Sequence, residues 1–150
     1  MERKVVISFL ASGQYVFAFC EAARCGLIDL MEQCLTVTET VNCKSVVCGG
    51  TPLHYACSGC SREAVCWLMS HGADVLVQDS DGTCPAEMIF YGLESDRVCL
   101  GLVGEIIGRV SRLEACILVD RLAKIAKATG REQCMPVVRA RVTSRFGVDG

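Results

Sequence analysis

The feature that most constrains this chain is an eight-residue stretch that recurs, in altered form, 33 positions later. Its first copy is Gly49-Gly50-Thr51-Pro52-Leu53-His54-Tyr55-Ala56, and its second is Gly82-Thr83-Cys84-Pro85-Ala86-Glu87-Met88-Ile89. The interval of 33 residues joins Gly49 to Gly82 and Pro52 to Pro85. A fixed period of this length indicates stacked copies of one small structural unit, in which each copy packs against its neighbours.

The first copy carries a helix start signal. Thr51 offers a hydroxyl oxygen to free backbone N–H groups, and Pro52 suits the first helical position, where its missing N–H costs nothing. We therefore expect a helix from Pro52 to about Ser58, ended by Gly59.

A second apolar-periodic stretch follows and predicts another helix from Glu63 to His71, with Gly72 as its C-terminal signal. Residues 73–82 are rich in Asp and Gly and predict an extended arm and a tight turn. Helix, break, helix and turn therefore repeat every 33 residues.

This pattern resembles the ankyrin repeat. The residues that match are Thr51-Pro52-Leu53-His54-x-Ala56, Glu63-x-Val65-x-x-Leu68-Met69-x-x-Gly72-Ala73-Asp74-Val75 and Asp79-x-x-Gly82. The resemblance implies an all-α fold, an ankyrin solenoid of about three helix-turn-helix units with short β-turn tips and a capping segment at each end. Such a stack presents a concave surface to a partner protein and performs no catalysis.

The period divides the ankyrin region, residues 17–110, into units over about 17–49, 50–82 and 83–110. The third unit departs furthest from the pattern, because Cys84 replaces the capping Thr and Glu87 replaces the His. Gly101 also stands inside its second predicted helix. Each of the two losses, of a cap oxygen and of a helix-favouring residue, should weaken a helix by about 1 kcal/mol. Terminal units of a stack tolerate such changes.

Both flanks are expected to support folding, since three units are near the minimum for a stable stack. Residues 1–16 are predicted to form an N-terminal capping segment, residues 111–129 a capping helix, and residues 130–150 a basic, partly disordered tail. The apolar side predicted for the capping helix consists of Leu113, Cys116, Ile117, Leu122 and Ile125.

Composition excludes a disordered chain, since 51% of the residues are apolar and 21% charged. The net charge of -2 conceals an uneven distribution of charge along the chain: residues 1–108 carry -7 and residues 109–150 carry +5. The basic end suggests an alternative function, binding of nucleic acid or an acidic partner through Arg139, Arg141 and Arg145, with the repeats as a rigid support. We favour a solvated tail, or one folded onto the acidic repeats, because Phe146 is the only ring there for base stacking.

Twelve cysteines suggest disulfides or a metal, and Cys57-x-x-Cys60 has ligand spacing. In the ankyrin frame, however, Cys57 faces the core, and most of the cysteines act as small apolar residues. We expect no metal, no cofactor and no disulfide framework, and single out Cys43 and Cys48 as an exposed pair for redox or metal tests. The two histidines, His54 and His71, have structural positions, so no active site is expected.

The N-terminus resembles a signal peptide only loosely, and the uncharged stretch from Val5 to Cys20 is shorter than the roughly 20 residues that a membrane helix needs. We therefore expect a monomer inside the cell, in the cytoplasm or the nucleus, without a membrane contact. Whether the chain is a whole protein or part of a longer array stays open.

The resemblance also implies which positions contact a partner protein. These are Arg24, Cys25, Val47, Cys48, Gly50, Ser58, Ser80, Asp81, Thr83 and Tyr91. Tyr91 is the predicted hot spot, because aromatic residues often dominate binding energy. Asp79 and Asp81 favour a partner with some basic character, and salt should weaken that preference. The identity of the partner is not predicted.

Overall fold

A computed structural model describes residues 2–147, which form helices, turns and bends without a β-strand. The predicted all-α class is thus confirmed. The helices are α1 (Glu2–Ala11), α2 (Tyr15–Cys25), α3 (Ile28–Thr38), α4 (Pro52–Ser58), α5 (Arg62–Ser70), α6 (Glu87–Tyr91), α7 (Asp96–Ile107), α8 (Arg112–Thr129) and α9 (Met135–Phe146), with a 3-10 turn over Glu132–Cys134.

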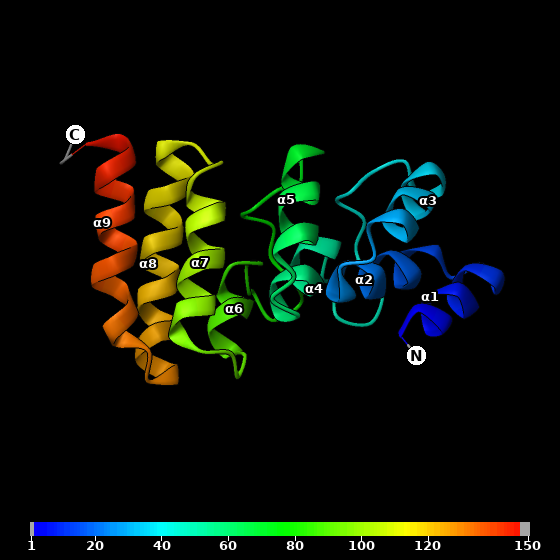
Figure 1. Cartoon of the computed structure of the whole chain (residues 1–150), viewed down its shortest axis with the longest axis horizontal. Helices are drawn as coiled ribbons and strands as arrows, with labels where there is room; N and C mark the ends of the chain where they lie inside the picture. Colours follow the sequence, from blue (N-terminus) through cyan, green and yellow to red (C-terminus); the bar gives the residue numbers. More distant parts are fainter. Residues whose placement is uncertain (1, 148–150) are drawn as a thin grey trace.

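The helices form a row of pairs that follows the order of the chain (Figure 1). The first helices of the pairs contact one another in the order α2, α4, α6, α8, and the second helices do so in the order α3, α5, α7, α9. Helix α1 packs on α2 at one end of the row. This two-layer stack is the solenoid that the 33-residue period predicts.

The central unit folds as its local signals predict. Helix α4 spans Pro52–Ser58 and is followed by Gly59, and α5 spans Arg62–Ser70, one residue earlier than predicted. The Thr51 N–H donates to Nδ1 of His54 at 3.0 Å, so the histidine side chain satisfies a backbone group that precedes the helix.

One apolar core runs through all the pairs. It extends from Val6 in α1 through Phe19, Leu53 and Phe90 to Val138 in α9, each of them almost fully buried. Because the core is continuous, each pair contributes one layer and is covered by the layers beside it.

In the third unit an ion pair occupies the place that the histidine has in the second. Glu87 lies in the position of His54, and its Oε1 accepts from the Cys84 N–H at 3.4 Å and from Arg121 at 2.8 Å. Arg121, which comes from α8, also donates to the Gly82 carbonyl at 3.1 Å. The turn of the third unit is therefore held mainly by Arg121, a side chain of the next helix pair, because the hydrogen bond within the third unit itself is long.

The apolar side predicted for α8 is wrong at its first positions. Leu113 is 71% exposed and Cys116 is exposed, whereas Ile117 and Ile125 are partly buried and Leu122 is buried. The buried stripe consists of Ala115, Leu118, Leu122 and Ala126. Alanines at both ends of this stripe match the helical spacing and allow close approach, so large apolar side chains were a poor guide to the buried face.

The predicted partly disordered tail is a helix in the structure. Helix α9 packs against α7 and α8, and Cys134, Met135 and Val138 are buried. Residues 148–150 lie outside the described range. Of the two predicted alternatives, a solvated tail and one folded onto the repeats, the structure shows the second, and Arg131 and Arg145 bind carbonyl groups of the preceding helix pair.

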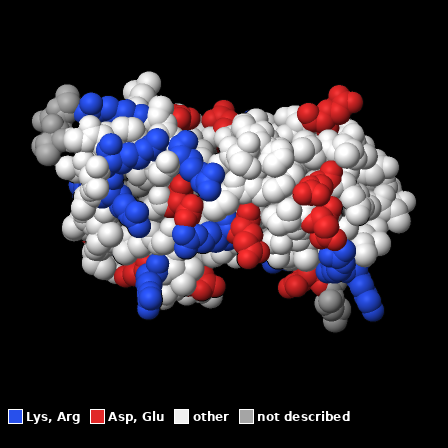
Figure 2. All heavy atoms as spheres, turned by 45° about the horizontal axis from the view of Figure 1, so that its top comes forward, with Lys and Arg blue, Asp and Glu red and all other residues white. Residues whose placement is uncertain are grey.

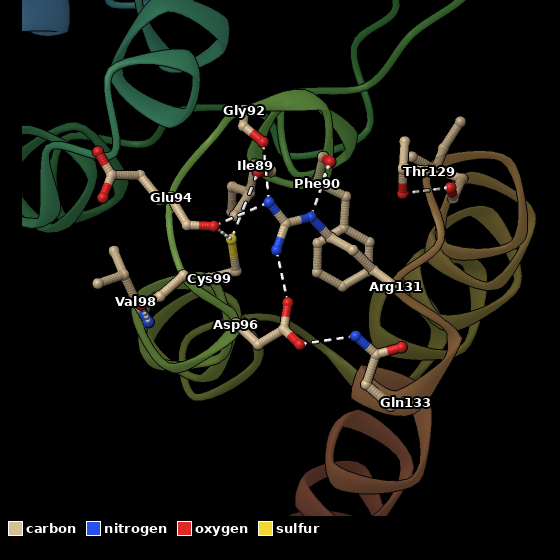
Figure 3. Close-up of polar contacts among 12 residues, drawn as sticks. Ile89, Phe90, Gly92, Glu94, Asp96, Val98, Cys99, Thr129, Arg131 and Gln133 are labelled. Atoms are coloured by element: carbon tan, nitrogen blue, oxygen red, sulfur yellow. Dashed lines mark hydrogen bonds and ion pairs between the residues drawn. The ribbon is translucent and has the colours of Figure 1, made fainter.

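Arg131 makes the largest set of such contacts (Figure 3). Its Nε donates to the Phe90 carbonyl at 3.1 Å, its Nη2 to the carbonyls of Gly92 and Glu94 at 2.8 Å each, and its Nη1 to Asp96 at 2.6 Å. The side chain is 13% exposed. One guanidinium therefore connects the segment before α9 to the whole loop between α6 and α7.

Arg145 plays a similar role at the other end of α9. Its Nη1 donates to the carbonyls of Ile107 and Val110, the second at 2.6 Å, just after α7 ends. These carbonyls have no partner within α7 itself, because the last turn of a helix leaves its acceptors free.

The replacement Arg131→Met should lower the free energy of unfolding by about 2–3 kcal/mol, because it leaves one carboxylate and three carbonyls without their charged donor. Chemical denaturation followed by circular dichroism measures this. Lys127→Met, which removes an exposed charge from the end of α8, is the matched control and should change stability by less than about 0.5 kcal/mol. Equal effects of the two variants would contradict the structural role of Arg131.

Two glycines offer an opposed pair of alanine substitutions. At Gly59 an added Cβ would overlap the carbonyl oxygen of Arg24 at the end of α2, whereas at Gly101, inside α7, it meets nothing within 4 Å. Gly59→Ala should destabilise the protein by about 1–3 kcal/mol. Gly101→Ala should stabilise it by up to about 1 kcal/mol, through helix propensity. Melting temperatures that shift in the same direction would contradict this packing.

Candidate functional site

A groove lies between the turn tips and the first helices of the second and third units, α4 and α6. It has a volume of about 230 Å³. Its lining consists of Cys48, Gly50, His54, Tyr55, Ser58, Asp79 and Met88. These residues come from the tip before α4, from α4 itself, from the next tip and from α6, so the groove exists only because two units stack.

His54 fastens one turn to the next. Its Nδ1 accepts the Thr51 N–H at 3.0 Å, which leaves the proton on Nε2, and Nε2 donates to the Thr83 carbonyl at 2.7 Å. Burial lowers the pKa of His54, so the ring is neutral at pH 7 and keeps this tautomer. Both ring nitrogens are thus occupied by structural hydrogen bonds, which leaves neither available as a catalytic base.

The first tip closes on itself through two backbone hydrogen bonds. The Ser45 N–H donates to the Gly50 carbonyl and the Gly49 N–H to the Ser45 carbonyl, both at 2.8 Å. Gly49 has a φ of +71°, a conformation that favours glycine. The tip therefore has a defined shape before any partner arrives.

The second tip is braced by a carboxylate and bound to the first. Asp79 Oδ1 accepts from the N–H groups of Asp81 at 2.9 Å and Thr83 at 3.0 Å. The Ser80 N–H donates to the Cys48 carbonyl at 2.9 Å, which joins the two tips directly. One wall of the groove is a row of connected turns.

The lining of the groove also includes a phenol. The hydroxyl of Tyr55 lies 3.4 Å from the Cys48 sulfur, and burial raises the pKa of Tyr55 to about 12. The phenol is therefore neutral at physiological pH and can both donate and accept a hydrogen bond. The groove offers an apolar surface with a few polar groups, which suits recognition of a side chain from a partner.

Several of the predicted contact residues lie together at this groove. Cys48, Gly50 and Ser58 line it. Val47 is exposed on the first tip, and on the second tip Ser80 and Asp81 are exposed and Thr83 is half-buried.

The remaining predicted contact residues lie elsewhere. Arg24 and Cys25 end α2, where Arg24 pairs with Glu21 at 2.9 Å. Tyr91 is 53% exposed and lines a separate hollow beside Arg131. Tyr91 ends α6 at the position that Ser58 has in α4, one unit further along the stack.

Sequence reasoning missed Tyr55 and Met88 as groove residues. They are 33 positions apart and therefore occupy the same place in successive units. This equivalence was a usable signal, since a side chain that faces the groove in one unit should do so in the next.

The predicted basic residues do not form one surface. Arg139 lines a shallow hollow with Cys116 and Asp120. Arg141 lies against Gly104 of α7, and Arg145 binds the carbonyls after α7. The helical turn of α9 separates the first of these side chains from the other two.

The twelve cysteines are free thiols, and Cys57 is fully buried, as the ankyrin frame implies. The prediction that Cys43 and Cys48 form an exposed pair is wrong, because both are partly buried and burial raises the pKa of Cys43. Cys116 is the exposed thiol. Within residues 2–147 no three His, Cys, Asp or Glu side chains gather where they could hold a metal ion, and no helix in this range is long and apolar enough to cross a membrane.

Comparison with known proteins supports the assignment of the central unit as an ankyrin repeat. Residues 48–80 match a family model described as Ankyrin repeat. The matched range begins at the first tip, covers α4 and α5 and ends in the second tip, so it contains most of the groove. No curated protein matches the chain.

The burial of His54 predicts a pH dependence of stability. The unfolded histidine binds a proton near pH 6.5, whereas the folded one does so only at lower pH, so the unfolded state takes up more protons between these values. Stability should therefore be full above pH 6.5 and fall below it by at most about 1.4 kcal/mol per pH unit. Denaturation of wild type and His54→Gln from pH 7.5 to 5.5 tests this.

His54→Gln should have a lower free energy of unfolding than wild type at neutral pH, and that free energy should fall little further between pH 7.5 and 5.5. The matched control is His71→Gln, which makes the same substitution at the exposed histidine. A wild-type pH profile that His54→Gln reproduces would contradict the assignment.

Proposed function

From the ankyrin repeat that this chain contains, we propose that it is a non-catalytic module that binds another protein in the groove between the turn tips and the first helices. Ankyrin repeats generally act as protein-interaction modules. The positions that this proposal assigns to the partner are those of the groove and its rim, with Arg24, Cys25 and Tyr91 as outlying contacts.

The observation that carries the proposal is an apolar tip beside a braced groove. Val46 is 94% exposed and Val47 72% exposed, although the turn that holds them is closed by hydrogen bonds. Two adjacent apolar side chains on a preformed turn are ready to be buried without loss of backbone entropy. Apolar surface at the centre with polar groups around it is typical of protein interfaces.

The charge of the rim favours a partner with some basic character. Asp81 is exposed at the second tip, and Asp79 lines the groove. Lys44 is also nearby, but its ammonium group donates to the Gln78 carbonyl at 3.4 Å. Binding should weaken as salt rises, because exposed charges are screened over about 10 Å at 0.1 M ionic strength.

The proposal includes a monomer without catalytic activity that works inside the cell. The alternative, in which Arg139, Arg141 and Arg145 bind nucleic acid with the repeats as a support, is less well supported. Arg139 lies on another side of α9 from Arg141 and Arg145, and Arg145 already donates to two carbonyls. A nucleic acid would need them along one track.

Affinity capture from a lysate of the source cells tests the proposal. Proteins that wild type enriches should be lost with Ser58→Arg, which fills the groove with a long side chain, and with Asp81→Arg, which reverses the rim charge. The matched control is Ser144→Arg, which places the same side chain on the exposed surface of α9 and should retain them. Circular dichroism establishes that all three variants are folded.

The contrary result is equally clear. If the set of captured proteins is the same for wild type and for both groove variants, the groove is not the binding surface.

A further inference from the structure

A second groove lies on the layer of second helices, between α5, α7 and α9. Its volume is about 570 Å³, and its lining consists of Arg62, Gly101, Gly104, Glu105, Gly108, Arg109 and Arg141. No residue of this lining belongs to the groove of the turn tips. Figure 2 shows that Lys and Arg gather mainly over the C-terminal helices on the face drawn, while Asp and Glu are more frequent towards the other end.

The glycines explain why the groove is open and why an arginine reaches into it. Gly101 and Gly104 of α7 and its C-cap residue Gly108 lie along one side of the helix and contribute no side chains to the groove. At Gly104 an added Cβ would lie 3.1 Å from Cζ and Nη2 of Arg141. The guanidinium from α9 therefore lies directly on the backbone of α7, in space that any other residue would occupy.

The three arginines come from three different helices or their ends, and a single carboxylate organises two of them. Glu105 pairs with Arg62 and, at 3.7 Å, with Arg109. The Arg62 guanidinium holds the pKa of Glu105 below its usual range, so the carboxylate stays ionised. No ion-pair partner of Arg141 is present among residues 2–147.

Three arginines and one glutamate leave the groove with a net charge of +2. Each guanidinium has five N–H donors in a planar fork, so the arginines that contact Glu105 keep donors free for a ligand. Such a set of forks, spread around a cavity, matches a group with several acceptor oxygens and a double negative charge.

We propose that this groove binds a phosphorylated serine or threonine in an extended segment of a partner protein. A phosphomonoester carries a charge of about -1.5 to -2 at pH 7 and three strong acceptor oxygens, which matches the charge of the groove. A single carboxylate supplies half of that charge. The volume lies within the roughly 300–1,000 Å³ of ligand pockets and accommodates the phosphorylated residue with its neighbours.

The groove favours a peptide over a nucleic acid. Single strands are held by rows of phosphate contacts together with aromatic rings on which bases stack. The lining contains no aromatic residue, and two of its three arginines pair with the same carboxylate, that of Glu105. This surface is separate from the groove of the proposed function, so either assignment can fail without the other.

The test uses the full chain, labelled with ¹⁵N, and short degenerate peptides with a central phosphoserine or phosphothreonine. The matched probe is the same library without phosphate. We expect the amide signals of Gly101, Gly104 and Gly108 to shift on titration, with an apparent Kd at least about tenfold lower for the phosphorylated library. Arg141→Met and, independently, Arg62→Met should raise that Kd about tenfold or more.

Two controls make the result specific. Arg139→Met removes the same charge from another side of α9 and should leave the Kd unchanged, and Ser58→Arg should do so as well. Arg62 is largely exposed, so its variant reports on binding even if Arg141→Met disturbs the packing on α7.

Equal affinity for the phosphorylated and unphosphorylated libraries would overturn the proposal. An equal loss of binding with Arg139→Met and Arg141→Met would also do so, since it would show a general charge effect. A single-stranded RNA oligonucleotide that shifts the same glycine signals at a lower Kd would assign the groove to nucleic acid instead.

Discussion

The burial of each helix pair against the next is the interaction on which this structure depends. Two helices of five to twelve residues, as in the pairs α4–α5 and α6–α7, cannot cover their own apolar faces. The faces are buried because α2, α4, α6 and α8 pack in a row and α3, α5, α7 and α9 pack beside them. A stack of this kind needs a cover at each end, and here α1 and the pair α8–α9 provide it.

The contacts of the C-terminal helices account for much of the excess of basic residues near the end of the chain. Arg121 replaces the missing turn hydrogen bonds at Glu87, Arg131 binds the loop between α6 and α7, and Arg145 caps the end of α7. Basic side chains of the last helices thus satisfy acidic and carbonyl groups of the preceding unit. These contacts bring basic side chains of the C-terminal helices onto the more acidic part of the chain, while Arg141 lines a groove without an ion-pair partner among residues 2–147.

Prediction from sequence succeeded where the signals are local. Thr51, Pro52 and Gly59 mark the ends of α4 within the chain itself, and the 33-residue period places the next tip. It failed for the buried stripe of α8 and for α9, because the partners that decide these elements are distant: Arg131 binds carbonyls 37 to 41 residues earlier. The groove was predicted in part, through Cys48, Gly50 and Ser58. Tyr91 lines a separate hollow one unit further along the stack, and its contact with a partner stays a prediction.

The continuous core implies that all the helix pairs, including the last, form one cooperative stack. Amide hydrogen exchange of the unmodified chain tests it most directly, since it reports the opening free energy of each helix separately. In a cooperative stack, the amides of Leu68 in α5, Leu122 in α8 and Val142 in α9 should exchange with similar free energies, close to that of global unfolding. Exchange of Val142 at the rate of an unstructured peptide, while Leu68 stays protected, would contradict it.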